Sequence, residues 1–366
     1  MPKGSFVSEN RRTKICFYIK NLLNIATLLA YINLKNQSLP DTGIIYDMNS
    51  PEKSVAPQVQ LVEITEENSD QRLDNFLISR LKGVPKSRIY RIVRKGEVRV
   101  NKGRVDVKYR LVAGDIVRIP PVRVAERSEE SYVPQGLQAA LREGILFEDE
   151  GFMIVNKPAG FAVHGGSGVS SGIIEGLRLL RPEAHFLELV HRIDKDTSGC
   201  LIIAKKRSAL KLLHELFRDN HVHKSYLALL AGQWTRKKLV VTAPLLKNVS
   251  KGGERMVVIS QAGKEAETLF RRLKLFSDST LVEAMPKTGR THQIRVHAAS
   301  LGHPIVGDER YGRDEINRGF KGRGYKRMFL HAEKLKFQHP ITGAALTILA
   351  PLPKQLEDLL NNEEQV

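Results

Sequence analysis

The sequence is poor in cysteine and lacks an uninterrupted long apolar run. Its only cysteines are Cys16 and Cys200, and neither has a partner at metal-ligand spacing. Such isolated thiols exclude a disulfide framework and are typical of a reducing cytoplasm. The most apolar stretch, residues 15–34, is broken by Lys20 and by asparagines, so its apolar pieces are too short to span a bilayer. We therefore expect a cytoplasmic protein without a membrane partner.

Acidic residues are also scarce. The chain has 40 of them against 58 Lys and Arg, which gives a net charge of +18 in 366 residues. The hydrophobic share of 42% is ordinary for a globular protein, so the imbalance does not reflect disorder. An excess of this kind favours a polyanionic partner, nucleic acid before membrane, over a merely basic soluble protein.

The first 69 residues carry no strong pattern. Residues 48–53, beginning Met48-Asn49-Ser50-Pro51, are typical of an ordinary protein start. We expect residues 1–47 to be an upstream extension from a misassigned start codon, or a dispensable tail. Residues 48–69 are polar and are predicted to be a flexible leader.

A compact module is predicted for residues 70–121. Leu73, Phe76, Leu77 and Leu81 recur at helical spacing. A second helix is predicted for 86–95, and Gly96 is placed to end it. Strands are predicted at 97–100, 104–110 and 116–119.

Most of the positive charge lies in this module. Residues 72–127 contain 16 Lys and Arg against 5 Asp and Glu, or +11. In the second helix Ile89, Ile92 and Val93 are predicted to face inward, and the basic side chains to face away. We predict that these cations bind a nucleic-acid backbone rather than forming only a solvated face. The predicted contacts are Lys86, Arg88, Arg91, Arg94, Lys95 and, on the following strand, Arg99.

After a charged linker at 122–142, a larger domain is predicted for 143–353, followed by a polar tail at 354–366. Apolar runs at 186–190 and 200–204 are predicted to be buried strands. The loop between them, His191-Arg192-Ile193-Asp194-Lys195-Asp196-Thr197-Ser198-Gly199, concentrates ionisable groups. Asp194 is therefore a candidate nucleophile or general base. The alternative is that Asp194 and Asp196 only form a turn.

A second segment strengthens the catalytic interpretation of that loop. Residues 288–297 bring Arg290, His292, Arg295 and His297 together. Thr291 is predicted to cap a helix from 292 to 301, with Arg295 one turn in. An Arg there can form a bidentate pair with a carboxylate and favour its ionised form, so Asp194 is its expected partner.

Competing chemistries fit less well. His292 and His297 are five residues apart rather than four, which argues against zinc bound on one helix face. Asp194 and Asp196 are too close in a turn to flank one glycosidic bond. The Gly-rich stretch 163–168 lacks the Gly-Lys-Ser/Thr of a phosphate-binding P-loop. The basic segment 313–327 is expected to be a solvated loop or an RNA clamp.

Motifs along the first module resemble those of S4 domains. They are 72–77, 84–89, 94–101 and 113–115, which read Arg-Leu-Asp-Asn-Phe-Leu, Val-Pro-Lys-Ser-Arg-Ile, Arg-Lys-Gly-Glu-Val-Arg-Val-Asn and Ala-Gly-Asp. The S4 domain is a small RNA-binding fold. The resemblance implies that the basic helical face grips structured RNA.

The second domain resembles the pseudouridine synthases of the RluA family. The signature His-Arg-x-Asp-x-x-Thr-Ser-Gly is complete at 191–199, and Gly-Arg-Thr-His-Gln-Ile-Arg-Val-His stands at 289–297. The segments 155–160, 224–226, 263–266 and 329–332 fit as well. The resemblance implies an α+β protein, in which an S4 domain precedes a catalytic domain whose mixed, largely antiparallel sheet is flanked by helices.

The resemblance also implies the reaction and the site. A uridine already in RNA is isomerised to pseudouridine, without cofactor or metal. Asp194 corresponds to the catalytic nucleophile, Arg295 to its basic partner, Tyr226 to the aromatic that stacks on the base, and Leu330 to an apolar wall. His191 and Arg192 are expected to handle the flipped nucleotide and its phosphates, and Arg290 and His292 to bind substrate. Whether the Asp attacks C1′ or C6, or removes the 2′ proton, stays open.

The leading hypothesis is a monomeric enzyme acting on several uridines of 23S ribosomal RNA or its precursor particle, with no obligate protein partner. The alternatives are a synthase of the same family acting on another rRNA site or on tRNA, and a non-catalytic RNA-binding assembly factor. The intact signature around Asp194 argues against the last. Asp196 to Gly199 are expected to shape the turn.

Overall fold

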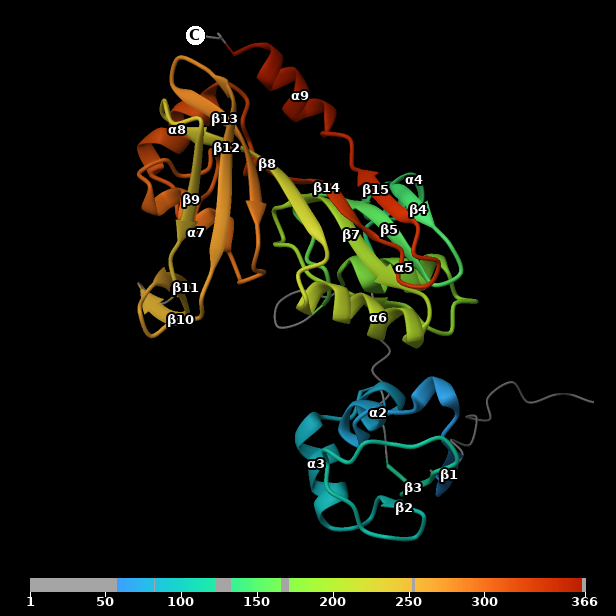
Figure 1. The fold of residues 1–366 in the computed structure, drawn as a ribbon. Coiled ribbons are helices and arrows are strands. Elements are labelled where there is room, and N and C mark those ends of the chain that lie inside the picture. The colour runs from blue at the N-terminus through green and yellow to red at the C-terminus, as the bar shows by residue number, and fades with distance from the viewer. Residues whose placement is uncertain (1–57, 82, 123–132, 166–170, 252–253, 364–366) are drawn as a thin grey trace, which may run out of the picture. The chain divides into compact units, whose positions relative to one another are not determined.

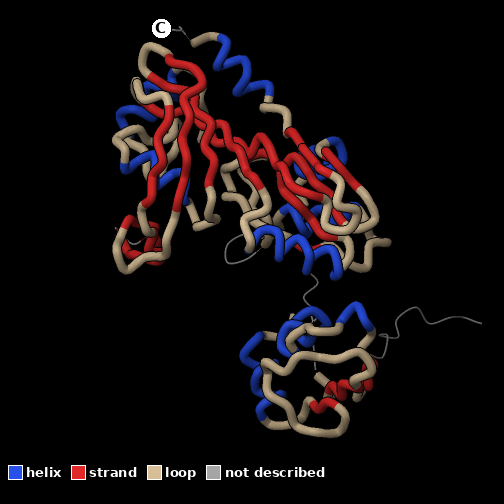
Figure 2. The backbone as a smooth tube through the Cα atoms, in the orientation of Figure 1, coloured by secondary structure: helices blue, strands red, loops and turns tan. Residues whose placement is uncertain are grey.

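The computed structural model describes residues 58–81, 83–122, 133–165, 171–251 and 254–363. They form an N-terminal module (58–122) and a C-terminal module (133–363), each with its own core. Figure 1 labels their elements and Figure 2 colours them by type. The expectations for residues 1–47, and for the Gly-rich stretch beyond Gly165, fall outside the described residues. Within those residues no helix has both the length and the apolar character needed to cross a membrane.

The N-terminal module packs two helices on a small antiparallel sheet in the order β1-β3-β2. Ile89, Ile92 and Val93 are buried in its core, as predicted, together with Leu73 and Leu77. Its elements are β1 (Gln60–Glu63), the 3-10 helix η1 (Glu66–Asn68), α2 (Leu73–Arg80), α3 (Lys86–Arg94), β2 (Arg99–Val100) and β3 (Ile116–Ile119).

Two expectations for this module were wrong. Residues 60–63, assigned to a flexible leader, form β1, which pairs with β3 along its length. Residues 104–110, expected to be a strand, form only an isolated bridge between Arg110 and Arg72. The Asp106 carboxylate accepts a hydrogen bond from the Lys108 backbone at 2.8 Å, and this turn diverts the chain from the sheet.

The C-terminal module is built on one ten-stranded sheet and a separate β10–β11 hairpin. Its helices are α4 (Gln135–Glu143), α5 (Ile173–Leu180), α6 (Arg207–Arg218), α7 (Gln293–Ser300), α8 (Asp314–Gly322) and α9 (Lys354–Asn361). Its strands are β4 (Ile145–Glu148), β5 (Phe152–Lys157), β6 (Glu188–Leu189), β7 (Ser198–Ala204), β8 (His223–Ala231), β9 (Lys238–Thr242), β10 (Leu245–Lys251), β11 (Glu254–Ile259), β12 (Glu267–Leu275), β13 (Ser279–Pro286), β14 (Leu330–Gln338) and β15 (Ala345–Leu349).

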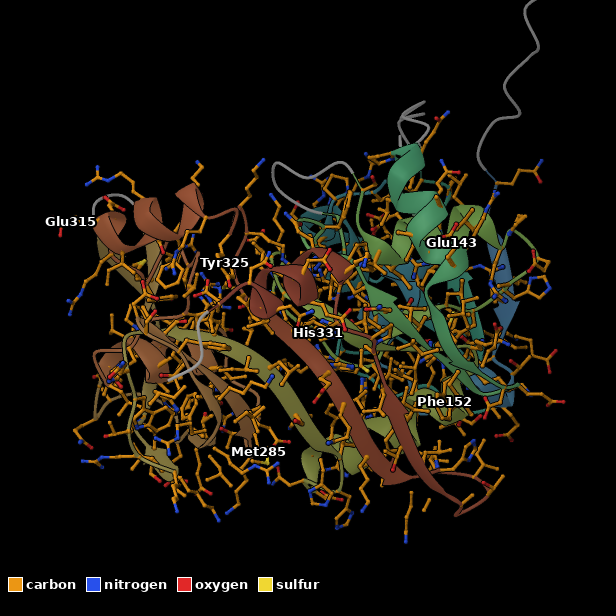
Figure 3. All side chains as sticks on the ribbon, turned by 90° about the horizontal axis from the view of Figure 1, so that it is seen from above. Glu143, Phe152, Met285, Glu315, Tyr325 and His331 are labelled. Atoms are coloured by element: carbon orange, nitrogen blue, oxygen red, sulfur yellow. The ribbon has the colours of Figure 1, made fainter. Side chains whose placement is uncertain are left out.

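The large sheet runs β4-β5-β7-β14-β8-β13-β12-β9, with β6 beside β7 and β15 beside β14 (Figure 1). In the described part of this sheet only β7 and β14 pair in parallel, where His331 is opposite Ser198 and Ala332 is opposite Gly199. Every other described pairing in this sheet is antiparallel. The expected mixed, largely antiparallel sheet is thus confirmed. Figure 3 shows His331 on β14 within the sheet, with Glu143 of α4 and Glu315 of α8 far apart on either side.

Strands β5 and β7 are buried on both faces, which explains why the sequence shows continuous apolar runs there. Met153, Val155, Leu201 and Ile203 pack into one cluster with helices α4 and α5. Their neighbours pack into a second cluster with α6; these are Phe152, Ile154, Cys200 and Ile202. The alternation follows from the two-residue period of a strand, and it fixes the strand that follows the Asp194 loop.

Three further expectations in this module were wrong. The linker was expected to run to residue 142, but 135–143 form α4, whose Leu137 and Leu141 are buried. The polar tail contains α9, anchored by the fully buried Leu356. Segment 313–327 is largely the helix α8, held by buried Phe320, rather than a solvated loop, and the alternative role as an RNA clamp stays a prediction. Each element has a narrow apolar stripe that a mostly polar composition conceals.

Candidate active site

The predicted catalytic and substrate-binding residues come together around one cavity of about 360 Å³. They lie on the 191–197 loop, on strands β8 and β14, and in the segment that leads into α7. The predicted residues that line the cavity are His191, Arg192, Asp194, Tyr226, Arg290, His292, Arg295 and Leu330. The fold therefore brings these predicted residues to one cavity, although some of them are more than a hundred residues apart in the sequence.

A buried lysine holds the loop that carries Asp194. Lys157, at the end of β5, is fully buried, and its Nζ donates hydrogen bonds to the carbonyls of Pro158 (2.8 Å) and Lys195 (2.9 Å). The Lys195 carbonyl also accepts a bond from the Gly160 backbone. Burial, with smaller effects of the surrounding charges, lowers the pKa of Lys157 to about 7. The loop is thus fixed through its backbone.

Ser198 and Gly199, expected to shape the turn, belong to strand β7 instead. Gly199 has φ +110°, and a Cβ there would overlap the Ala332 carbonyl of β14. Ser198 lies 2.8 Å from Nδ1 of buried His331 and accepts a hydrogen bond from Arg327 at 2.8 Å. These residues lock the end of the loop to β14, because only glycine permits so close an approach there.

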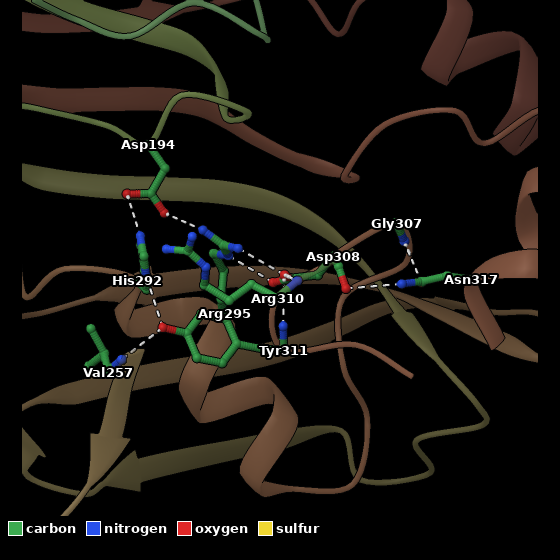
Figure 4. A network of polar contacts seen from close by, with 9 residues as sticks. All are labelled: Asp194, Val257, His292, Arg295, Gly307, Asp308, Arg310, Tyr311 and Asn317. Atoms are coloured by element: carbon green, nitrogen blue, oxygen red, sulfur yellow. Dashed lines mark hydrogen bonds and ion pairs between the residues drawn. The ribbon is translucent and has the colours of Figure 1, made fainter. Parts of the chain in front are cut away.

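Arg295 contacts Asp194, but its bidentate partner is a different carboxylate. Its Nη1 donates to Asp194 Oδ2 at 3.2 Å. Its Nε and Nη2 donate to the two oxygens of Asp308, at 2.7 and 2.8 Å (Figure 4). The expected bidentate pair with Asp194 was therefore wrong. Although burial lowers the pKa of Arg295, the carboxylates of Asp308 and Asp194 raise it above its usual value, so the guanidinium is a permanent cation.

Asp308 is itself fully enclosed and oriented. It is 1% exposed and accepts backbone hydrogen bonds from Arg310 and Tyr311, both at 3.0 Å. Burial opposes ionisation, but the Arg295 contacts and these amides hold the pKa of Asp308 below its usual value. Asp308 therefore stays ionised and fixes the plane of the guanidinium that faces Asp194.

His292 joins the same network from the other side of Asp194. Its Nε2 lies 4.0 Å from Asp194 Oδ1, and its Nδ1 lies 2.8 Å from the Tyr311 hydroxyl (Figure 4). Burial lowers the pKa of His292, so the ring is neutral near pH 7. The predicted cap by Thr291 was wrong, because His292 itself is the N-cap of α7, with a left-handed backbone at φ +53°. That conformation turns the ring toward Asp194.

Part of the cavity lining is apolar and aromatic. Tyr226 of β8 and the buried Leu330 of β14 form it together with Ile294. Burial, and then the nearby Asp194 carboxylate, raise the pKa of Tyr226, so its phenol remains protonated. A flat apolar wall facing a carboxylate suits a planar base with an attached sugar.

His191 lines the cavity as a neutral ring. Its Nε2 accepts a hydrogen bond from the Ile202 backbone at 3.0 Å, and the ring stacks on Phe217 at 4.8 Å. Burial and nearby Lys224 lower the pKa of His191 to about 3. It therefore lacks the positive charge expected of a phosphate contact. Arg192 is exposed, and exposed Arg290 donates to the Glu265 carbonyl at 3.0 Å.

The predicted RNA contacts of the N-terminal module divide into two groups. Lys86, Arg91, Arg94 and Lys95 of α3 and its end are exposed. Arg88 is half-buried, and Arg99 is tied to the Gly96 and Lys102 carbonyls. The exposed group is free to follow a phosphate backbone.

Sequence reasoning missed three residues of the site. Asp308 and Tyr311 lie in a loop without a chemical pattern of its own, and only the fold brings them to Arg295 and His292. Lys224 lines the cavity two residues before Tyr226 on β8. Its sequence signals were its place in segment 224–226, which fits the family resemblance, and the spacing to Tyr226, because residues two apart on a strand share a face.

The described residues contain no group of His, Cys, Asp and Glu side chains that could hold a metal ion. The site instead offers one carboxylate in a cavity that has both apolar and cationic lining residues, with a fixed guanidinium and a neutral imidazole beside the carboxylate. This arrangement can present an ionised oxygen to a bound nucleoside and keep water away from the reacting bond.

Comparison with known proteins agrees with this geometry. Residues 151–300 match the model of the RNA pseudouridylate synthase family, and residues 71–117 match that of the S4 domain. The chain is 57% identical to ribosomal large subunit pseudouridine synthase C of Yersinia pestis, over 84% of this chain and 97% of the relative. The protein of that name from Escherichia coli K12 is also 57% identical, over 84% and 98%. The structure of human RNA pseudouridylate synthase domain containing 1 covers 64% of this chain and 92% of its own, with 27% identity and a TM-score of 0.53.

The chain therefore belongs to the RNA pseudouridylate synthase family, and it carries an S4 domain in its N-terminal module. It is an isomerase that converts uridine in RNA to pseudouridine. The α+β fold and the identification of the family, both inferred from sequence, are confirmed.

Proposed function

We propose that the enzyme modifies several uridines of 23S ribosomal RNA. The observation that carries this proposal is the 57% identity to proteins named ribosomal large subunit pseudouridine synthase C, extending over nearly their whole length. The same alignment includes both the S4 domain and the catalytic domain. Agreement across both favours a shared RNA target over a shared reaction alone.

Asp194 is proposed as the catalytic nucleophile, because it is the carboxylate that faces both the apolar wall and the guanidinium of Arg295. Arg295 orients it and maintains its charge. Tyr226 stacks on the uracil, and Leu330 closes the pocket. Arg192 and Arg290, at the exposed rim, bind the flanking nucleotides, and His292 holds the Asp194 side of the substrate. The geometry suits attack at C1′, attack at C6 or removal of the 2′ proton.

Target recognition is proposed to depend on the exposed cations of α3. A uridine must leave its stack before Asp194 reaches its sugar or base, which costs a few kcal/mol. Contacts of Lys86, Arg91 and Arg94 with phosphates offset that cost and make binding sensitive to salt. The partner is 23S rRNA or its precursor ribosomal particle. We expect a monomer that acts in the cytoplasm without an obligate protein partner.

Mapping pseudouridine in total RNA from cells lacking the gene tests this proposal. Loss of pseudouridine at 23S positions, restored by the wild-type gene and not by the Asp194→Asn variant, is the expected result. Loss confined to tRNA or to another rRNA would show that the proposed RNA target is wrong and that the protein is still a pseudouridine synthase. No loss anywhere, together with restored ribosome assembly by Asp194→Asn, would favour an assembly factor instead.

A further inference from the structure

The cavity that Asp194 lines also contains a lysine, Lys224, to which the proposed reaction assigns no role. Lys224 and Tyr226 lie two residues apart on β8, so they share a face of the strand. Both line the cavity that Asp194 faces. Phe217, Arg218 and Asn220, from the end of α6 and the turn after it, line the same cavity.

The two rings next to Lys224 are uncharged. Its Nζ lies over the Phe217 ring, 5.8 Å from the centroid. The neutral His191 ring stacks on the same Phe217 ring. Arg218 is exposed and pairs with Asp219 at 3.3 Å. Among the ion pairs formed by the described residues, none involves Lys224.

An unpaired cation in such a place is unfavourable for the protein alone. Lys224 is half-buried, and burial lowers its pKa. Partly removing an ammonium from water without an opposite charge has a free-energy cost that a neutral side chain would avoid. A residue that is unfavourable for stability and faces an active-site cavity is expected to meet its partner in the substrate.

We propose that Lys224 binds a phosphodiester that flanks the uridine held in the cavity. A compact ammonium on a flexible stem matches a full negative charge on a phosphate oxygen, whereas a uracil carbonyl offers only a partial charge. Asn220 lines the same cavity and has a side-chain amide that can donate to a second phosphate oxygen. The inference rests on the RNA substrate, and it holds whichever RNA contains the target uridine.

Binding measurements with the variant Lys224→Gln test the proposal, on an RNA fragment that the wild-type enzyme is first shown to modify. Loss of one phosphate contact should weaken binding about tenfold at low salt and reduce the slope of log Kd against log salt by about one. The matched control is Lys211→Gln on α6, an exposed lysine that does not line the cavity. It should leave the Kd nearly unchanged. An unchanged salt slope for Lys224→Gln would overturn the proposal.

To identify the phosphate that Lys224 contacts, single phosphodiesters of the RNA fragment are replaced by an uncharged methylphosphonate. A 2′-hydroxyl would cleave a neighbouring methylphosphonate, so each altered fragment carries a 2′-deoxy sugar on the 5′ side of that linkage. It is compared with a phosphodiester fragment that carries the same deoxy sugar. One linkage beside the target uridine should weaken binding to wild type and have no further effect on Lys224→Gln. Fully additive losses at every linkage would contradict a direct contact.

Thermal unfolding separates a binding role from a structural one. Lys224→Gln removes a cation without a protein counterion, so its Tm should equal or exceed that of wild type. A Tm several degrees lower, with weaker binding, would show that Lys224 supports the fold. Because the fragment is chosen by its modification, an error in the 23S assignment would leave this result unaffected.

Discussion

The positive charges of α3 and those around Asp194 use the same chemical groups in opposite ways. Lys86, Arg91 and Arg94 are exposed along one helix. Arg295 is 7% exposed and donates hydrogen bonds to two carboxylates, Asp194 and Asp308. The side chains on α3 keep their conformational freedom, whereas the Arg295 guanidinium is fixed in one orientation.

This difference separates attraction from positioning. An exposed cation contributes at most about 1 kcal/mol through any one protein ion pair, and salt screens it. Its value lies in attracting a polyanion. A buried pair that loses one partner destabilises a protein by about 3–5 kcal/mol. Substitutions in the site should therefore alter rate and stability, whereas those on α3 should alter affinity and its salt dependence.

The largest effect is expected at Asp194. Asp194→Asn keeps the shape of the side chain but removes the ionised oxygen, so pseudouridine formation should fall by at least about 10³-fold. Single-turnover assays with the target RNA measure this loss. RNA binding should survive, because the α3 cations are unchanged. Substantial activity in Asp194→Asn would remove it from the role of nucleophile.

Asp308→Asn should give the next largest effect. It leaves Arg295 with one carboxylate and a misdirected guanidinium, so the rate should fall about 10²-fold and the Tm should fall as well. The control Asp314→Asn makes the same carboxylate-to-amide change at an exposed residue of α8 and should leave the rate unchanged. If Asp308→Asn kept the wild-type rate, Asp308 would have no part in positioning Arg295.

The residues at the centre of the candidate site could be picked out from the sequence because their pattern is local. Asp194 stands in a polar loop between two apolar runs, and Arg295 stands one turn into a predicted helix. Asp308 was not predictable in this way, because its role comes from contact with Arg295 across the fold. The bidentate pair was assigned to the wrong carboxylate for the same reason, since sequence gives residue types but not distances.

The fold was predictable where apolar periodicity is strong and was missed where it is weak. Strand β7 is buried throughout, and helix α3 buries three apolar residues at helical spacing. Strand β1 has four residues, and α9 has one fully buried side chain, Leu356. Such short elements are stabilised by tertiary packing rather than by their own propensity. Local patterns therefore did not distinguish them from a leader or a tail.

A triple substitution on α3 tests the other half of the comparison. Lys86, Arg91 and Arg94, all changed to Ala, should raise KM for the RNA at least about tenfold and reduce the salt slope of binding by about two to three. The single-turnover rate at saturating RNA should stay close to wild type. Titrations at several salt concentrations measure both quantities.

The control for α3 removes the same charge elsewhere. Lys211, Lys238 and Lys336 are exposed on the C-terminal module, outside the cavity. Changing all three to Ala should alter KM much less than the α3 triple. Equal effects would mean that total charge, rather than the α3 surface, governs RNA binding.

The smallest effect concerns Lys157, a buried cation that has no carboxylate partner in an ion pair among the described residues. Its pKa is about 7 in the folded protein, because burial disfavours the charged form, and 10.5 is its ordinary value. Between these values the unfolded chain binds more protons than the native protein, so the free energy of unfolding rises with pH. Lys157→Met removes this dependence. Relative to that variant, the wild type should gain about 1 kcal/mol of stability between about pH 6 and pH 8. Other titrating groups cancel in the difference, which urea unfolding at both pH values measures. Parallel stability curves would show that the Lys157 ammonium does not titrate in this range, and that the carbonyls of Pro158 and Lys195 stabilise its charge as effectively as water does.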